Sequence, residues 1–577
     1  MKEIKEIIRA YQQARAAGKQ AALVTVVHVE GSSYRSPGAR MLVTEDGMLT
    51  GAISGGCLEG DALRKALLVM MEERPLLVTY DTSDEDAAAW GVALGCNGII
   101  RVLIEPIPPG TAETPVSLLQ RAVEKRQYSV IVTCFTPEDK KNPAQGTCLA
   151  VTTDGAYHVD GKPAIPYAHM AADIAQVRET KGSVFVRYPD GEGTAVIVFM
   201  EYLAPPPALV VAGAGNDVLP LAALAELMGW EVTLVDGRPA YADEARFPSC
   251  RIIVSGPSDA LDQASIDEDT AVILMSHNYD YDKAVLERAI NTPARYIGIL
   301  GPAKKRERLL AELAIEESTV SSAGRRIFGP MGLDIGAETA EEIALSVMAE
   351  IKAVFAGKAG EHLADVGGSI HRRQTRILPS LRVYGIMVLA AGESKRLGTP
   401  KQQLTYRGQT LLERSVRGAL ETGVAATVVV LGAGAETIQE KLEGLPVNKV
   451  INVDHQSGIA SSIRSGVQWF KAHYPHVENV LIMLCDQPHV DTGHLHKLIQ
   501  AQQLSGARIV ASHYADRKGV PAVFHSSLFP QLLNLKGDTG AKHIIEALED
   551  EVLAVSFPQG AVDVDTEEAY GQILADS

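Results

Sequence analysis

The sequence has few of the features that mark several protein classes. Its 577 residues include only six cysteines, which form neither a CxxC pair nor a cysteine–histidine metal pattern. A low and scattered cysteine count excludes a disulfide scaffold and indicates a reducing compartment. No apolar run approaches the roughly 18–20 residues that a membrane helix requires. The first 20 residues resemble an amphipathic helix rather than a signal peptide. We therefore expect a cytoplasmic protein without membrane association.

Positive charge is also scarce. The chain has 54 Lys and Arg against 71 Asp and Glu, a formal net charge of −17, and it contains no concentrated basic run. Such a surface repels a phosphate backbone, so nucleic-acid binding is disfavoured. The sequence also lacks a glycosidase carboxylate pair, a nucleophile elbow and an HExxH motif. With 46% hydrophobic and 22% charged residues, the chain is an ordinary folded protein of about three or four domains.

The order of predicted elements suggests α/β domains in series. Alternating strands and helices beyond three consecutive prolines, Pro205 to Pro207, predict a parallel sheet with helices on both faces. A second strand–helix alternation begins near Tyr384. The predicted segments are a mixed α+β amino-terminal region at 1–204 with a divergent part at 106–204, a Rossmann-like domain at 205–356, a linker at 357–382 and a second Rossmann-like domain at 383–577.

The sharpest motif is LAAGESKRLGTPK, which directly follows an apolar strand in the last domain. Its glycines let the backbone bend around a triphosphate so that peptide N–H groups point at phosphate oxygens. Its small residues let a flat base lie against the main chain. Arg396 and Lys401 add positive charge where a leaving pyrophosphate would develop negative charge. The residues expected to bind a nucleotide are Leu389, Ala390, Ala391, Gly392, Gly398 and Lys401.

This segment resembles the MobA-like nucleotidyltransferases, which include the molybdenum cofactor guanylyl- and cytidylyltransferases. The resemblance extends from Tyr384 to Asp576 and implies a GT-A-like fold. It implies Mg²⁺ as the cofactor, with Asp486 of LCDQP and Asp565 of DVDTEEAY as metal ligands. It also implies Arg396, Lys401 and Asp486 as the catalytic residues. The LAAG start resembles the cytidylyl branch, so CTP is the expected substrate.

The middle domain contains a partial dinucleotide motif. Gly213 and Gly215 follow the strand ALVVA, and Asp236 ends the next strand, where its carboxylate would accept the hydroxyls of a ribose. The third glycine of the full fingerprint is replaced by Val218. An NAD(P)-dependent oxidoreductase built on this domain therefore stays an alternative, although the glycine pattern argues against it.

Residues 1–355, apart from the divergent stretch, resemble the XdhC/CoxI family through blocks such as GSSYRSPGARMLV, GAISGGCLEGD, VTLVDGRPAYADEARFP and ARYIGILGPAKKRERLL. The resemblance implies a protein that holds molybdenum cofactor, assists its sulfuration by a cysteine desulfurase and delivers it to an apo molybdenum hydroxylase of the xanthine dehydrogenase type. Asn216 stands where the family carries a histidine, so no role of that histidine transfers to this chain.

Several residues outside these motifs are candidates for cofactor binding. Cys57 follows two glycines and precedes a predicted helix whose dipole would lower the thiol pKa. It is either a reactive thiolate or a small buried hydrophobe. Arg35 and Arg40 flank a Ser/Gly/Pro loop and either hold a pterin phosphate or lie in solvent. The residues expected to be structural are Cys96 and Cys485, as small apolar side chains, and His277 and Asp280, in a local hydrogen-bonded turn.

The leading hypothesis is a fusion of two steps in molybdenum cofactor handling. The last domain would transfer CMP from CTP to the molybdopterin phosphate with release of pyrophosphate. The rest would bind the product and deliver it, and tethering raises the effective concentration of a labile intermediate. The alternatives are the oxidoreductase, a non-catalytic cofactor chaperone and a sugar-phosphate nucleotidyltransferase. The sequence leaves open whether the chain forms a homo-oligomer.

Overall fold

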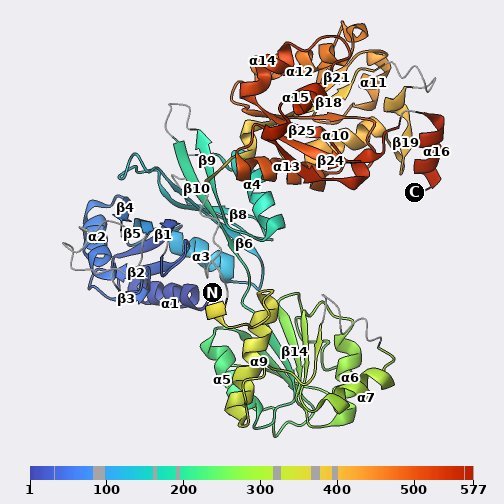
Figure 1. The fold of residues 1–577 in the computed structure, drawn as a ribbon. Coiled ribbons are helices and arrows are strands. Elements are labelled where there is room, and N and C mark those ends of the chain that lie inside the picture. Colours follow the sequence, from blue (N-terminus) through green and yellow to red (C-terminus); the bar gives the residue numbers. More distant parts are fainter. Residues whose placement is uncertain are drawn as a thin grey trace.

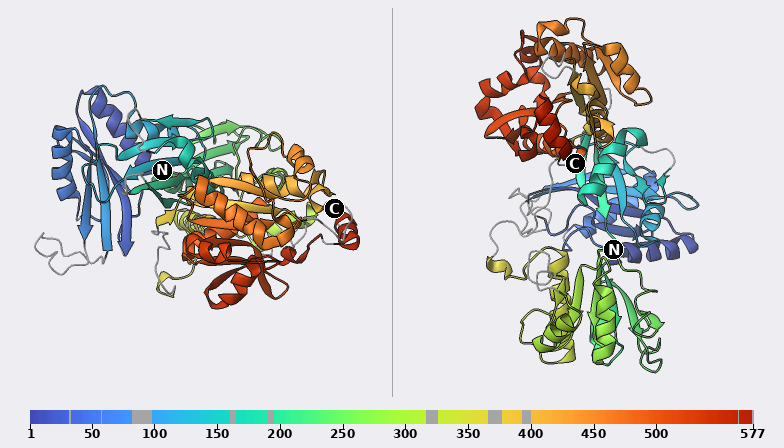
Figure 2. Two further views of the ribbon diagram at one scale, coloured as in Figure 1. Left: turned by 90° about the horizontal axis from the view of Figure 1, so that it is seen from above. Right: turned by 90° about the vertical axis from the view of Figure 1, so that its right-hand side faces the viewer.

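The computed structural model consists of three bodies arranged along the molecule. It describes the whole chain except residues 32, 57, 82–97, 160–164, 190–194, 316–325, 366–376, 393–399, 565 and 576–577. The amino-terminal region lies between the middle domain and the carboxy-terminal domain (Figure 1). The side view in Figure 2 shows the same order. The parallel and mixed sheets confirm the predicted α/β class.

The first half of the amino-terminal region is an antiparallel sheet with the order β3-β2-β1-β5-β4. Helix α1 packs Ile4, Ile7, Ile8 and Tyr11 into the core, which confirms the predicted amphipathic helix. Helix α2 covers the sheet through Ala62, Ala66, Val69 and Met70. The elements are α1 (Lys2–Ala16), β1 (Ala21–Gly31), β2 (Arg40–Thr44), β3 (Leu49–Gly51), α2 (Glu59–Glu72), β4 (Leu76–Asp81) and β5 (Gly98–Ile107).

The second half is a six-stranded sheet with the order β17-β9-β10-β6-β7-β8. Its edge strand β17 (Ile377–Pro379) comes from much later in the chain and pairs in parallel with β9. The stretch 357–382 therefore includes a strand of this sheet as well as the short 3₁₀ helix Leu363–Asp365. The remaining elements are α3 (Pro115–Val123), β6 (Ser129–Phe135), β7 (Gly146–Val151), β8 (Ala156–His158), α4 (Tyr167–Thr180), β9 (Val184–Pro189) and β10 (Ala195–Leu203).

The middle domain has an all-parallel sheet with the order β13-β12-β11-β14-β15-β16. Alternate residues of β11 face opposite cores, one formed with α5 and α9 and the other with α6 and α7. Helices thus cover both faces, as the alternation of predicted elements indicated. The elements are β11 (Ala208–Ala212), α5 (Val218–Leu227), β12 (Glu231–Asp236), β13 (Arg251–Val254), β14 (Thr270–Leu274), α6 (Tyr279–Ala289), β15 (Tyr296–Ile299), α7 (Ala303–Glu312), β16 (Ile327–Phe328) and α9 (Ala340–Phe355).

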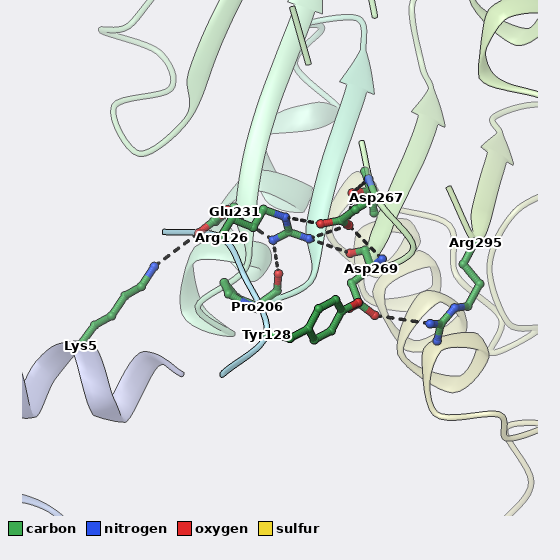
Figure 3. Close-up of polar contacts among 9 residues, drawn as sticks. Lys5, Arg126, Tyr128, Pro206, Glu231, Asp267, Asp269 and Arg295 are labelled. Carbon is green, nitrogen blue, oxygen red and sulfur yellow. Dashed lines mark hydrogen bonds and ion pairs between the residues drawn. The ribbon is translucent and has the colours of Figure 1, made fainter. Parts of the chain in front are cut away.

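Arg126 joins the amino-terminal region to the middle domain at the amino ends of that parallel sheet (Figure 3). Its Nε and Nη2 atoms donate to the two carboxylate oxygens of Asp267 at 2.8 and 2.9 Å, and its Nη1 donates to the carbonyl of Pro206. The Tyr128 hydroxyl donates to Asp269 at 2.7 Å. We call these contacts the Arg126 clamp. They lie at the amino ends of the strands, whereas ligands of parallel sheets bind at the carboxyl ends.

Asp173 of α4 joins the amino-terminal region to the carboxy-terminal domain. The side chain is 2% exposed. It accepts hydrogen bonds from the Tyr188 hydroxyl, the Ser380 hydroxyl and the backbone N–H of Leu381, at 2.5, 2.8 and 3.0 Å. Burial raises the pKa of this carboxyl. The chain passes from β17 through a 3₁₀ turn at Leu381–Val383 directly into β18, so Asp173 anchors the entry to the last domain.

The carboxy-terminal domain is a seven-stranded mixed sheet with the order β22-β21-β18-β23-β25-β24-β26. The central strands β21, β18 and β23 are parallel. The main elements are β18 (Tyr384–Ala390), α10 (Leu411–Glu421), β21 (Ala426–Leu431), α11 (Ala435–Lys441), β22 (Asn448–Ile451), α12 (Ile459–His473), β23 (Asn479–Leu484), α13 (Thr492–Ser505), β24 (Ile509–Tyr514), β25 (Arg517–His525), α14 (Phe529–Leu533), α15 (Ala541–Ala547), β26 (Val552–Ser556) and α16 (Glu567–Ala575).

The hairpin β19 (Thr405–Tyr406) and β20 (Gln409–Thr410) follows the predicted nucleotide loop, and short 3₁₀ turns complete the domain. The 3₁₀ turns are at Lys401–Gln403, His455–Ser457, Ser526–Leu528, Glu549–Glu551 and Pro558–Ala561. Within the part of the chain that the structure describes, no helix has both the length and the apolar composition needed to cross a membrane.

Candidate functional site

The predicted nucleotide loop leaves the carboxyl end of the central strand β18. Leu389, Ala390 and Ala391 are buried. A Cβ at Gly432, just after β21, would lie 2.7 Å from the Ala391 carbonyl oxygen. Glycine at this position therefore allows the loop to pack against the neighbouring strand, as a site for a flat base requires. Arg396 and Gly398 lie outside the described residues.

Gln402 supports this loop from beneath, a role that the sequence did not reveal. The side chain is 3% exposed. Its Nε2 donates to the carbonyl oxygens of Ala390 at 2.8 Å and Gly392 at 3.0 Å. One amide thus fixes the two carbonyls on either side of Ala391, which restricts the backbone at the start of the loop. A glutamine next to the predicted lysine was the only sequence signal, and nothing in it indicated a backbone contact.

Lys401 and Asp486 meet at the carboxyl edge of the sheet. Lys401 Nζ lies 3.3 Å from Asp486 Oδ2, and both side chains are about one-fifth exposed. Asp486 comes two residues after β23, the neighbour of β18. The sequence predicted both residues from separate motifs, and the fold brings them together. Cys485 belongs to the apolar core, as expected, and burial raises the pKa of its thiol.

The carboxy-terminal acidic segment lies beside Asp486. The N–H of Val564 donates to the Asp486 carbonyl at 3.1 Å. Burial raises the pKa of the Tyr514 hydroxyl, and the charges of Asp563 and Asp486 raise it further. Asp565 lies outside the described residues. Mg²⁺ prefers carboxylate oxygens and is held by one or two of them together with substrate phosphates. The carboxylate of Asp486, just beyond the end of β23, is therefore a ligand of the kind that the predicted ion prefers.

The segment that begins at Asn452 follows β22 and lies near the same carboxyl edge of the sheet. Asn452 is buried and its Nδ2 donates to the hydroxyls of Ser461 and Ser462, at 2.7 and 3.0 Å. The Cβ of His455 would lie only 2.6 Å from a Cβ added at Gly432. Because Gly432 also packs against Ala391, His455 lies close to the start of the predicted nucleotide loop. The polar cluster fixes the start of α12 beside the predicted base-binding position.

The corresponding edge of the middle domain has a different charge arrangement. Gly213 has φ +120°, and a Cβ there would lie 2.4 Å from the carbonyl oxygen of Met275. Asp236 accepts hydrogen bonds from the Ala214 N–H and from the backbone and guanidinium of Arg238, at 2.7–2.9 Å. Burial favours a raised pKa for this carboxyl, but these bonds lower it below its usual value. Both carboxylate oxygens of Asp236 thus already accept hydrogen bonds from the protein. A ribose hydroxyl would have to compete with these bonds.

Family models match three parts of the chain. A model of the XdhC and CoxI family matches residues 14–81, an XdhC Rossmann domain matches residues 209–351, and a MobA-like NTP transferase domain matches residues 386–552. A Bacillus subtilis protein named as a probable xanthine dehydrogenase subunit is 31% identical, over 58% of this chain and 92% of its own length. The chain belongs to the XdhC and CoxI family and carries a MobA-like NTP transferase domain.

Two further relatives match stretches of different extent. A molybdenum cofactor insertion chaperone of Escherichia coli is 26% identical, over 60% of this chain and 87% of its own length. A nicotine blue oxidoreductase of Paenarthrobacter nicotinovorans is 31% identical, over 33% of this chain and 96% of its own length. The first match is about as long as the XdhC-type part of the chain, and the second is about as long as the MobA-like domain.

In the XdhC-type part, the two predicted arginines are engaged in ion pairs. Arg35 pairs with Glu3 of α1. Arg40 is 1% exposed, and its guanidinium contacts the carboxylate of Glu201 in β10. The expectation that Arg40 either lies in solvent or holds a phosphate therefore differs from the structure, in which the side chain joins the two amino-terminal sheets.

The glycine-rich loop before α2 is organised around Ser54 and Glu59. The Ser54 hydroxyl accepts hydrogen bonds from the N–H groups of Gly56 and Leu58 at 3.2 and 3.1 Å. The Glu59 carboxylate accepts the N–H groups of Ile53 and Ser54 at 3.2 and 2.8 Å. Cys57 and Cys96 lie outside the described residues. Ser54 was not singled out from the sequence, because its spacing to Glu59 matches no capping motif and Leu58 is the N-cap residue of α2.

Proposed function

We propose that the MobA-like domain transfers CMP from CTP to the phosphate of molybdopterin cofactor with release of pyrophosphate. A phosphate oxygen of the pterin attacks the α-phosphorus of CTP, and the bond from that phosphorus to the pyrophosphate oxygen breaks. The observation that carries the proposal is the Lys401–Asp486 pair beside the glycine loop, in a chain whose other part is XdhC-type. Positioning and charge neutralisation supply most of the catalysis in phosphoryl and nucleotidyl transfer.

The residues predicted from the motifs, together with Gln402, have the following proposed roles in this reaction. Asp486, with Asp565 or Asp563, would hold Mg²⁺, which supplies charge stabilisation at the phosphates when bound. Lys401 would contact phosphate oxygens together with Arg396. Gln402 holds the backbone on which Leu389, Ala390 and Ala391 receive the base. Gly392 and Gly398 would let the loop approach the phosphates closely.

We further propose that the XdhC-type part binds the product and delivers it to an apo molybdenum hydroxylase of the xanthine dehydrogenase type. The printed names of the Bacillus subtilis and Escherichia coli relatives support this role, since the first refers to xanthine dehydrogenase and the second to cofactor insertion. The proposed cofactor contacts are Cys57 and Arg35 of the amino-terminal region and Gly213, Gly215 and Asp236 of the middle domain. A cysteine desulfurase is the proposed sulfur donor.

The test is turnover by the full chain with molybdopterin cofactor that carries no nucleotide, together with Mg²⁺ and one nucleoside triphosphate at a time. We expect pyrophosphate release and a CMP-modified pterin with CTP, and little turnover with GTP. Turnover with GTP alone would contradict the cytidylyl assignment. Asp486→Asn with undiminished turnover would contradict the assignment of the site.

A second candidate is an oxidoreductase, which the printed name of the Paenarthrobacter nicotinovorans relative favours. The engaged carboxylate of Asp236 weighs against a dinucleotide in the middle domain, so the candidate concerns the MobA-like domain. NADH and NADPH fluorescence titrations of the full chain would test it. Binding that Asp486→Asn leaves unchanged, together with no pyrophosphate release from any nucleotide, would favour the oxidoreductase.

A further inference from the structure

A histidine and an aspartate from two separate loops meet at the carboxyl edge of the middle sheet. His277 Nε2 lies 2.7 Å from Asp217 Oδ2, and the two side chains are 63% and 26% exposed. Asp217 follows β11 and His277 follows β14, the neighbouring strand on the side opposite to β12. Ligands bind in open parallel sheets at this reversal of strand order. His277 thus belongs to the ligand edge rather than to the local turn that the sequence predicted.

The loop that carries His277 is held by charges buried beneath it. Asp282 is fully buried and accepts a hydrogen bond from Lys305 Nζ at 2.7 Å and one from the Ser276 hydroxyl at 2.5 Å. A buried ion pair has a large desolvation cost, so it is weak evidence for stability. Here it fixes Ser276, next to His277, whose φ of +56° is uncommon for a residue other than glycine. Such backbone conformations cluster at functional sites.

The opposite loop is fixed as well. Arg246 donates to the Ala214 carbonyl at 2.9 Å and to the side-chain oxygen of Asn216 at 2.8 Å. Asp217 directly precedes α5, a helix of ten residues, and its side chain does not cap the helix. A pyrophosphate would normally lie at this helix end, where the Asp217 carboxylate would repel it. The edge is therefore rigid and unsuited to the anionic centre of a dinucleotide.

The pair fixes the chemistry of the imidazole. A carboxylate only accepts hydrogen bonds, so Nε2 of His277 carries the proton that bonds Asp217. In the ring form with one proton, Nδ1 presents a lone pair. The structure gives Nδ1 no hydrogen-bond partner among the residues it describes. The edge thus offers an oriented hydrogen-bond acceptor to a ligand that carries N–H donors.

We propose that His277 Nδ1 accepts a hydrogen bond from an N–H group of the pterin ring, with Asp217 as the positioning residue. The inference rests on the proposed function, in which the XdhC-type part carries a pterin cofactor. That cargo has an anionic phosphate end and a heterocyclic end with N–H donors. Because Asp217 repels anions, the heterocyclic end faces this edge and the phosphate end points away from it.

Footprinting of His277 in the full chain tests the proposal. Diethylpyrocarbonate modifies exposed imidazoles, and peptide mass spectrometry measures the rate at each histidine. Cofactor released from a purified molybdenum hydroxylase, added without nucleotide, should slow modification of His277 at least about tenfold, as loss of access to a hydrogen-bonded nitrogen requires. His169, an exposed histidine on α4, is the internal control. Equal rates at His277 with and without cofactor would overturn the proposal, and so would protection by NAD(H).

Variants of Asp217 test the positioning role with the same readout. Asp217→Ala releases the ring and should raise the cofactor concentration for half-protection about tenfold. Asp217→Asn keeps an oxygen that accepts the Nε2 proton and should change it little. Asp280→Ala removes an exposed carboxylate from the first turn of α6, three residues after His277, and is the matched control. Equal effects of the three variants would overturn the positioning role. CMP transfer reports on the other domain, so its failure alongside intact protection would contradict only the transferase proposal.

Discussion

The middle and carboxy-terminal domains place opposite charges at corresponding positions of similar sheets. In each sheet the central strand, β11 or β18, lies between two parallel neighbours and ends in a glycine loop. In the middle domain the loop after the central strand supplies the acid, Asp217, and the loop after the next strand supplies the base, His277. In the MobA-like domain the order is reversed, with Lys401 from the first loop and Asp486 from the second.

This exchange determines which ligand each edge favours. A lysine on the first loop attracts phosphates, and a carboxylate on the second strand is placed for a cation that binds the same phosphates. An aspartate on the first loop repels phosphates and orients an imidazole instead. The two domains lie at opposite ends of the molecule (Figures 1 and 2). A ligand that uses both edges must therefore leave one before it reaches the other.

The largest expected effect comes from removing the carboxylate of the MobA-like edge. Asp486→Asn should lower the rate of pyrophosphate release from CTP by about a hundredfold to a thousandfold, because the phosphates lose their cation-binding group. Protection of His277 by cofactor should stay unchanged. The measurement is a coupled pyrophosphate assay, with Asp550→Asn, an exposed aspartate, as the control. A parallel loss at both edges would break the comparison.

The side chains that hydrogen-bond to the two loops, Gln402 and Arg246, give a second prediction. Gln402 holds carbonyls on either side of Ala391, just as Arg246 holds Ala214 and Asn216 in the middle domain. Gln402→Leu should reduce kcat/KM for CTP by about tenfold to a hundredfold, since small displacements of a binding loop have large effects on rate.

Its neighbour supplies the matched control for that prediction. Gln403→Leu changes a half-buried side chain that makes no side-chain hydrogen bond to any residue the structure describes, and we expect nearly full activity. Circular dichroism of both variants separates loss of positioning from loss of folding. If the two leucine variants lose activity equally, Gln402 does not position the loop.

The attachment of the middle domain gives a third prediction, which concerns the edge away from the ligand. Arg126→Ala removes the hydrogen bonds to Asp267 and Pro206 and should destabilise the middle domain by about 1–3 kcal/mol in urea unfolding. X-ray scattering should show a changed arrangement of the domains. Arg121→Ala, at a half-exposed arginine of α3, should have no such effect. Loss of CMP transfer in Arg126→Ala would show that the activity of the MobA-like domain depends on the contact between Arg126 and the middle domain.

Local motifs predicted one edge better than the other. The glycine loop, Lys401 and Asp486 were recognisable because nucleotide binding uses backbone groups and charges at fixed spacing. The pairing of Asp236 with Arg238, two residues away, was also within reach of local reasoning. The Asp217–His277 pair was not, since 60 residues separate its members and only the order of strands brings them together.

Contacts that depend on backbone position were hidden from the sequence in the same way. Gln402 and Arg246 bind carbonyl oxygens, which every residue possesses, so no residue type marks the partner. The polar stretch 357–382 gave no sign of a strand, because β17 has three residues and its pairing with β9 is decided by tertiary packing. The parallel sheet of the middle domain, in contrast, followed directly from the alternation of apolar strands and helices.

The smallest expected effect concerns the stability of the MobA-like domain below neutral pH, which depends on a buried histidine. His494 on α13 is buried, stacks on Phe557 at 3.8 Å between ring centroids and bonds Ser512 at 2.8 Å. Burial lowers its pKa to about 4, whereas an unfolded histidine titrates near 6.5. Between these values the unfolded chain binds the extra proton, so the MobA-like domain should lose stability as the pH falls, by at most about 1.4 kcal/mol per pH unit. His494→Gln should flatten this slope in urea unfolding from pH 7 to 4, and His473→Gln, at an exposed histidine, should not. An unchanged slope in His494→Gln would assign the acid sensitivity to other groups.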